Sequence, residues 1–198
     1  MTTNTIETDA RAVLDFWFGA PGSATDGKQR PEWFRKSDAF DREIESRFAP
    51  LIARALDGGL GAWDATPQGA LARIVVLDQF TRNVFRGTPR AFGGAALALA
   101  AAQALVARGA DELLTPLQRV FAYLPFEHAE SLAMQDESMR LFTRLCSGDE
   151  GFASQLDYAR RHREIVRRFG RFPHRNLIVG RVSTAEELAF LEQPGSSF

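Results

Sequence analysis

Arginine and histidine are concentrated in one stretch near the C-terminal end of the sequence. The fifteen residues 167–181, RRFGRFPHRNLIVGR, contain no acidic residue, although the net charge of the whole chain is only -1. Their basic and imidazole side chains are Arg167, Arg168, Arg171, His174, Arg175 and Arg181. Guanidinium groups match carboxylates and phosphates in a bidentate geometry. The stretch therefore predicts either a binding site for an anion or a set of internal ion pairs, and its composition favours neither.

A second group of polar side chains lies in the first half of the chain. Asp78 and Arg82 are four residues apart with the acid first, which favours an ion pair on a helix. Gln79, Asn83 and Arg86 follow at helical spacing, so one side of that helix offers adjacent hydrogen-bonding groups. The same pattern is typical of a solvated helix face with one salt bridge, which contributes little to stability.

The chain has three histidines, and two of them interrupt apolar stripes of predicted helices. Glu127 and Glu130 flank His128, and His162 lies on the next helix. If these helices pack as an antiparallel pair, His128 and His162 come within reach of each other and of His174. One hypothesis is therefore acid–base catalysis by His128 or His162, oriented by a neighbouring glutamate. A histidine on an apolar face is more often a hydrogen-bonded core residue, and that interpretation stays open.

Several other chemistries lack a motif in this sequence. The histidines have no metal-site spacing such as H-E-x-x-H, and the single cysteine, Cys146, excludes a thiolate zinc cluster. No G-x-S-x-G, P-loop, G-x-G-x-x-G or C-x-x-C string is present. We therefore expect no metal and no cofactor.

Composition also indicates which classes of partner and which cellular compartment to expect. A pI of about 6.3 argues against a nucleic-acid-binding protein. The alanine-rich run 93–107 is too short to cross a bilayer, so we expect a packed helix and no membrane partner. The N-terminal residues lack the features of a signal peptide, and one cysteine suits a reducing compartment. These observations predict a cytoplasmic protein.

Helix start signals recur along the chain. Threonine followed by proline, a typical N-cap and first helical residue, occurs at 66–67, 88–89 and 115–116. The second pair predicts a helix that ends near Gly109, and Gln118 gives the third pair a capping box. We expect further helices from Pro125 to about Cys146 and over 152–169. A last helix is expected from Ser183, with Glu186 completing its capping box.

One segment has two interpretations. The apolar run Ile74–Leu77 followed by Asp78 fits a buried strand, which would imply an α/β enzyme. The helical spacing of Leu71, Ile74, Leu77 and Val84 favours a helix, and other strand signals are confined to 177–179. We therefore expect an all-α fold of about eight to ten helices in a single compact domain over residues 1–198.

Five strings give the sequence a family resemblance. They are FWFG at 16–19, the LDQF-RN-FRGT pattern at 77–88, PFEHAE at 125–130, FGRFPHRN at 169–176 and GR-ST at 180–184. They resemble the bacterial family known as domain of unknown function 924 over nearly the whole chain. The resemblance implies a tetratricopeptide-repeat-like fold of antiparallel helix pairs, and it implies no reaction. Thr81 stands where the family often has proline, a departure that leaves the helix intact.

The resemblance also implies a set of candidate site residues. Mapped onto this sequence, these are Asp78, Gln79, Arg82, Asn83, Arg86, Glu127, His128, Glu130, His162, Arg168, Arg171, His174, Arg175, Asn176 and Arg181. The first hypothesis is a helical binding protein with a concave, arginine- and histidine-lined pocket for a small anion or an acidic peptide end. Its pocket would gather Arg82, Arg86, Arg171, His174 and Arg175.

Two alternatives stand beside this binding hypothesis. One is the hydrolase-like or other acid–base enzyme described above, in which the arginines hold a negatively charged substrate. The other is purely structural, with arginines capping helix ends and pairing with Asp78, Glu127 and Glu130 in a polar seam. The sequence leaves the oligomeric state and the identity of any ligand open.

Overall fold

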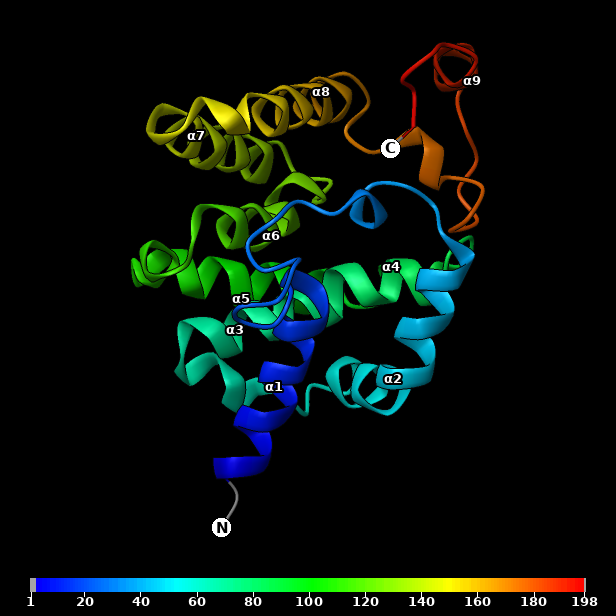
Figure 1. Ribbon diagram of the computed structural model, residues 1–198. Helices are drawn as coiled ribbons and strands as arrows, with labels where there is room; N and C mark the ends of the chain where they lie inside the picture. Colours follow the sequence, from blue (N-terminus) through cyan, green and yellow to red (C-terminus); the bar gives the residue numbers. More distant parts are fainter. Residues whose placement is uncertain (1–2, 198) are drawn as a thin grey trace. The chain divides into compact units, whose positions relative to one another are not determined.

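The all-α prediction is confirmed. The computed structural model describes residues 3–197, with side chains from residue 8 onward, and this part of the chain contains helices, turns and no strand (Figure 1). The N-terminal segment, which we expect to have no signal-peptide features, begins with Met1 and Thr2. These two residues lie outside the described residues. The chain divides into two compact units, residues 1–86 with 90–125 and residues 87–89 with 126–198. The expectation of a single domain over 1–198 stays a prediction.

Unit 1 contains the first six α-helices, the last of which continues two residues into unit 2. They are α1 (Thr3–Phe18), α2 (Asp38–Leu56), α3 (Pro67–Ile74), α4 (Thr81–Val84), α5 (Ala95–Ala107) and α6 (Pro116–Glu127). Aromatic rings fill its core: Trp17 lies within 5.7 Å, centroid to centroid, of Phe40, Phe80 and Phe121. Trp17 of α1 therefore contacts α2, α6 and Phe80, which lies between α3 and α4.

The N-cap signals of unit 1 act as the sequence predicts. The Thr66 hydroxyl accepts a hydrogen bond from Gly69 N at 3.0 Å at the start of α3. The Thr115 box is complete, since Gln118 N donates to Thr115 Oγ1 at 3.3 Å and Thr115 N donates to Gln118 Oε1 at 3.1 Å. Each bond satisfies a backbone group that the first helical turn leaves unpaired.

The segment 67–84 is helical, so the strand interpretation is wrong. It runs through α3, a π-helical turn at Val75–Phe80 and α4 without a break. All six residues of the π turn are buried, which explains why the apolar run also resembled a buried strand.

The predicted continuous helix from Thr88 to Gly109 is wrong. A 3-10 turn at Pro89–Phe92 ends before Gly93 and Gly94, and α5 begins only at Ala95. At Gly94 a Cβ atom would lie 2.2 Å from the carbonyl oxygen of Leu77. The break therefore reflects a tertiary contact in which only glycine lets the two backbones approach.

By length and composition alone, the apolar segment that contains α5 could span a membrane. This segment, Pro89–Ala107, has 19 residues, and its most apolar part has a mean hydropathy of 1.4. The helix α5 itself has 13 residues, a length of about 20 Å, which is shorter than the hydrocarbon core of a bilayer. The expectation of a packed helix fits Ala98, Ala101, Ala102 and Leu105, which are buried.

Unit 2 consists of two long helices followed by a turn and a short helix. These are α7 (Leu132–Gly148), α8 (Ala153–Phe169), a 3-10 turn at Pro173–Arg175 and α9 (Ala185–Leu191). Helices α7 and α8 lie side by side (Figure 1). Ile165, Val166 and Phe172 form a small core, and Phe169 and Phe190 pack against it.

Two expected helix starts in this region are wrong. Pro125 lies inside α6, which ends at Glu127, and α7 begins after Ser131. His128 therefore lies in the turn between two helices and not on the apolar stripe of α7. The last helix starts one residue later than expected, because Thr184 and Glu187 form the capping box in place of Ser183 and Glu186.

Candidate functional site

All three histidines of the chain lie close together in unit 2. The rings of His128 and His162 have centroids 6.2 Å apart, and Phe172 lies 5.4 Å from His162 and 5.7 Å from His174. The expected proximity of the histidines is thus observed, although His128 reaches it from the turn after α6. We call His128, His162 and His174, together with Glu127 and Arg175, the histidine cluster.

His162 is the buried member of the cluster, with 4% of its surface exposed. Its Nδ1 lies 2.9 Å from the Tyr158 carbonyl oxygen and 3.2 Å from Glu127 Oε1. A carbonyl oxygen only accepts hydrogen bonds, so in the neutral ring Nδ1 carries the proton and Nε2 is the acceptor. The sequence interpretation of a hydrogen-bonded core histidine therefore holds for His162.

The pKa of His162 is lowered to about 3. Burial is the main cause, and repulsion from His128 adds to it. The hydrogen bond to Tyr158 raises the pKa, whereas Arg175 and His174 lower it further. An ionised Glu127 at 3.2 Å would favour the imidazolium, but burial and the surrounding positive groups outweigh it. His162 is therefore neutral at pH 7.

Arg175 connects the histidine cluster to the turn that follows α8. Its Nη1 donates to the His128 carbonyl oxygen at 2.9 Å, and its guanidinium carbon lies 4.3 Å from the centroid of the Phe172 ring. A cation over an aromatic face is stabilised by the ring quadrupole. Arg175 therefore fixes the backbone of His128 and brings a positive charge into a largely buried environment.

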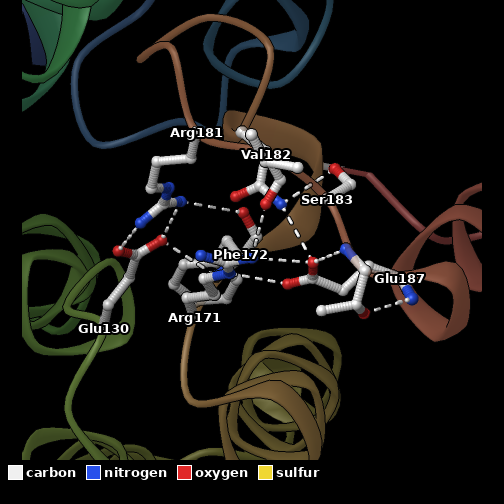
Figure 2. Close-up of polar contacts among 9 residues, drawn as sticks. Glu130, Arg171, Phe172, Arg181, Val182, Ser183 and Glu187 are labelled. Carbon is white, nitrogen blue, oxygen red and sulfur yellow. Dashed lines mark hydrogen bonds and ion pairs between the residues drawn. The ribbon is translucent and has the colours of Figure 1, made fainter.

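Other arginines of the 167–181 stretch pair with glutamates. Arg181 donates to both carboxylate oxygens of Glu130, at 2.6 and 2.8 Å, and Arg171 does the same to Glu187 at the same two distances (Figure 2). Arg168 forms a more exposed pair with Glu186. These contacts are the internal ion pairs that the composition left open.

The two paired glutamates have lowered pKa values. Burial raises the pKa of Glu130, but hydrogen bonds from Arg181 and from Phe172 N lower it by more, so the net shift is downward. The hydrogen bonds from Arg171 are the main cause that holds the pKa of Glu187 at about 2. Both carboxylates are therefore ionised at pH 7 and hold their arginines in place.

Asn176 links the ends of the loop 176–183, which carries Arg181. Its Nδ2 donates to Ser183 Oγ at 3.0 Å, and its backbone carbonyl accepts from Arg181 N at 2.8 Å. Arg171 Nη2 also donates to the Val182 carbonyl oxygen at 3.0 Å (Figure 2). The two ends of the 176–183 loop are thereby held together.

The remaining candidates lie in unit 1, on the π turn, on α4 and, for Arg86, in the turn after α4. Asp78 and Arg82 form the expected pair, with Nε 3.4 Å from Oδ1, and the Asp78 side chain is 1% exposed. Asn83 and Arg86 both donate to Asp41 on α2, at 2.6 Å for Asn83 Nδ2 and 3.0–3.2 Å for Arg86. Asn83 therefore connects α4 to α2, and Arg86 connects the turn after α4 to the same helix.

The comparisons with known proteins agree with this architecture. The sequence profile described as bacterial protein of unknown function (DUF924) matches residues 13–195. The chain belongs to the DUF924 family. A solved relative is the protein of unknown function ATU0120 from Agrobacterium tumefaciens, which is 38% identical and has a TM-score of 0.83. The similarity covers 94% of this chain and 98% of that one. No curated protein matches the chain.

In this DUF924 protein two of the strings that carried the resemblance lie in the site of unit 2. FGRFPHRN ends α8 and supplies Arg171, Phe172, His174, Arg175 and Asn176, and PFEHAE ends α6. Within residues 3–197, no group of three or more histidine, cysteine or acidic side chains is placed to hold a metal ion. That finding concerns only the described residues.

Two residues that position this site are absent from the predicted set. Glu187 accepts hydrogen bonds from Arg171. The only feature of the sequence that could have identified Glu187 is the T-x-x-E spacing of its capping box. Gln135 is fully buried, and its Nε2 donates to the carbonyl oxygens of Glu127 at 2.6 Å and Ala129 at 2.8 Å. The feature of the sequence that could have identified Gln135 is that a glutamine interrupts an apolar stripe. Gln135 therefore acts on the backbone next to the histidine cluster, whereas Glu187 holds the Arg171 and Asn176 side chains on either side of His174.

Proposed function

We propose that this protein binds a small anion or an acidic peptide end at the histidine cluster of unit 2. The observation that carries the proposal is the convergence of all three histidines and Arg175, from three different segments, around Phe172. His128 and His174 are half-buried, so a solute can reach them, whereas His162 is buried behind them. Side chains that bind anions in other proteins are thus gathered at one place.

The electrostatics of the cluster support an anionic ligand. Besides burial, His128, Arg175 and His174 lower the pKa of His162, and of these three groups Arg175 carries a positive charge at pH 7. Arg175 would attract a bound carboxylate or phosphate, and in a partly desolvated position that attraction is stronger than in water.

The arginine–glutamate pairs reduce the number of arginines that we assign to ligand contact. Arg168, Arg171 and Arg181 already donate to glutamates, so we assign them the supporting role of the structural alternative. The ligand-contacting set that we propose is His128, His174 and Arg175, the basic groups of the histidine cluster besides the buried His162.

Calorimetric titration with phosphate, citrate and an acidic C-terminal peptide tests the proposal. His174→Asn and Arg175→Lys should each weaken binding by about tenfold or more, roughly 1.4 kcal/mol. The matched control is Arg167→Gln, because Arg167 is exposed and its contact is with Glu164 on its own helix. Equal binding by all four proteins, or weakening by the control alone, would show that the cluster is not the site.

A second candidate function is acid–base catalysis at the same cluster. It is favoured by the 3.2 Å contact between Glu127 Oε1 and His162 Nδ1, which fixes the tautomer with Nε2 as proton acceptor. Burial makes His162 a weak base, so we assign the proton transfer to His128 and a positioning role to Glu127 and His162. A panel of ester, amide and phosphate substrates tests this. An activity that survives His128→Asn unchanged would contradict it.

The proposal includes two further expectations, one about helix packing and one about location. The resemblance implies tetratricopeptide-like helix pairs, and the side-by-side packing of α7 and α8 supports that arrangement. Composition implies a cytoplasmic location. Superposition of an experimental structure on tetratricopeptide repeats tests the first, and fractionation of bacterial cells tests the second.

A further inference from the structure

The loop that follows the histidine cluster exposes large apolar side chains. Leu177 and Val182 are 92% and 88% exposed, more than any other large apolar side chain in the part of the chain that the structure describes. Val179, which lies between them in the sequence, is 36% exposed. Single exposed apolar residues are ordinary, whereas several on one short loop indicate a contact surface. We call Leu177, Val179 and Val182 the apolar loop patch.

Helical geometry places Leu177 beside His174. The 3-10 turn that contains His174 and Arg175 continues into Asn176, whose φ of -54° and ψ of -50° are helical. Val179 N then donates to the Arg175 carbonyl oxygen at 3.0 Å. Residues three apart on a helical turn lie on the same side of it. The exposed Leu177 is therefore next to His174, which is half-buried.

The other end of the loop brings Val182 to the same place. Arg181 N donates to the Asn176 carbonyl oxygen at 2.8 Å, and Asn176 Nδ2 donates to Ser183 Oγ at 3.0 Å. The residues on both sides of Val182 are thus bonded to the residue that precedes Leu177. These hydrogen bonds fix the loop before any ligand arrives, which lowers the entropic cost of binding on it.

The chemistry of the two adjacent surfaces defines a class of ligand. Arg175 is positively charged, and with His174 it belongs to the anion-contacting set of the proposed function. The apolar loop patch next to them offers aliphatic surface. A ligand that uses both surfaces carries an anionic group close to an aliphatic group.

The openness of the patch favours the end of a peptide over a free small molecule. Small ligands are usually held in clefts that bury most of their surface, whereas Leu177 lies on an open turn. In the last residue of a peptide, the carboxylate and the side chain are attached to the same Cα atom. Both can therefore reach neighbouring residues such as His174 and Leu177, while the rest of the peptide extends across the surface.

We propose that the histidine cluster and the apolar loop patch together bind the C-terminal end of a peptide whose last side chain is aliphatic. The terminal carboxylate lies at His174 and Arg175, and the last side chain packs against Leu177 and Val182. This inference rests on the proposed function, because it takes its anion-binding residues from there. It adds a specificity for the last side chain that the anion site alone does not have.

Calorimetric titrations of the whole chain with matched peptides test the inference. The peptides are N-acetylated tetrapeptides of three alanines followed by leucine or by glycine, and the leucine peptide with a C-terminal amide. Burial of most of a leucine side chain should make the leucine acid bind about tenfold or more tighter than the glycine acid. The amide, which lacks the charge, should bind about tenfold or more weaker than the leucine acid.

Variants assign the preference to the patch. Leu177→Ser, and the double variant that adds Val182→Ser, should reduce the leucine-to-glycine affinity ratio to less than about threefold. Both side chains are exposed, so these changes leave the fold intact. The matched control is Leu113→Ser, which removes an exposed leucine of unit 1 and should keep the ratio at about tenfold or more. A ratio that stays the same in the double variant would overturn the proposal.

The remaining outcomes distinguish this inference from the function on which it rests. Equal binding of the leucine and glycine acids would overturn the inference and leave the anion site standing, as would phosphate or citrate binding without peptide binding. An amide that binds as tightly as the acid would overturn the role of the carboxylate. Free isocaproate that binds as tightly as the leucine peptide would assign the site to a small carboxylate and overturn the peptide end. Absence of binding by every anion would overturn the proposed function and this inference together.

Discussion

His162 should make the protein sensitive to mild acid. Its ordinary pKa is 6.5 and its folded pKa is about 3, because the ring is buried next to His128, Arg175 and His174. The unfolded chain therefore takes up a proton below pH 6.5 that the folded protein refuses until about pH 3. Stability is lost as the pH falls through this window, and above pH 6.5 this residue has no effect on the pH dependence.

The size of the loss follows from the two pKa values. Between pH 7.5 and 5.0 the free energy of unfolding should fall by about 2 kcal/mol from His162 alone. For a chain of 198 residues this corresponds to a decrease in Tm of about 4–8 °C. Glu130 and Glu187 do not contribute there, because their lowered pKa values remove stability only below their ordinary value of 4.5.

Guanidinium denaturation followed by far-UV circular dichroism at pH 7.5, 6.0 and 5.0 measures this dependence. Circular dichroism reports both units, whereas Trp17, Trp33 and Trp63 all lie in unit 1. The matched variant is His162→Asn, whose amide nitrogen takes the place of Nδ1. It should be less stable than the wild type at pH 7.5, and its stability should change little between pH 7.5 and 5.0.

Two results would refute the reasoning. A wild-type stability that stays constant down to pH 5.0 would mean that Glu127 holds His162 as an imidazolium in the folded state. A slope that persists unchanged in His162→Asn would assign the proton uptake to His128 or His174, the only other histidines of the chain.

Three further changes test the contacts that build the two units. Gly94→Ala should destabilise the protein by about 2–3 kcal/mol, because its Cβ would lie 2.2 Å from the Leu77 carbonyl oxygen. Glu187→Gln should cost about 2 kcal/mol at pH 7, because it removes the charge that Arg171 binds, and it should flatten the loss of stability between pH 4.5 and 2. Gln135→Leu should cost about 2 kcal/mol by leaving helix-end carbonyl groups without a donor. Denaturant titrations measure all three.

Each of these changes has a control of the same chemical kind. Gly148→Ala should be neutral or stabilising, since nothing lies within 4 Å of a Cβ there. Glu186→Gln should change stability by less than about 1 kcal/mol, because the side chain is 62% exposed. Gln193→Leu, at an exposed position, should also have little effect. Equal losses in a variant and its control would mean that the contact assigned to the variant does not contribute.

The local signals of this sequence predicted two helix caps correctly and failed where tertiary contacts decide the helix boundaries. The Thr66 and Thr115 caps lie where expected, because a cap depends on residues within one helical turn. The helix from Thr88 failed at Gly94, where the backbone of α5 meets Leu77, a contact that no local pattern encodes. Pro125 failed as a helix start for a related reason, since Gln135 from α7 binds the carbonyl groups at the end of α6 and stabilises that ending.

The candidate site shows the same division. Composition identified the arginine stretch and the three histidines, and the helical spacing of Asp78 and Arg82 predicted their pair. The sequence could not distinguish the arginines that pair with glutamates from Arg175, which lies beside the histidines. Arg181 and Glu130 are 51 residues apart in the sequence, and Arg171 and Glu187 are 16 apart. Neither separation corresponds to a helical repeat.

The sequence by itself determined the helical class, the family and the chemical types of the site residues, because helix propensity, capping and composition act over a few neighbouring positions. Only the tertiary structure decided which carboxylate each arginine binds and that His128, His162 and His174 meet around Phe172. These outcomes depend on burial and on distances between segments far apart in the chain. A charge pair or a shifted pKa exists only once packing has removed water from both partners.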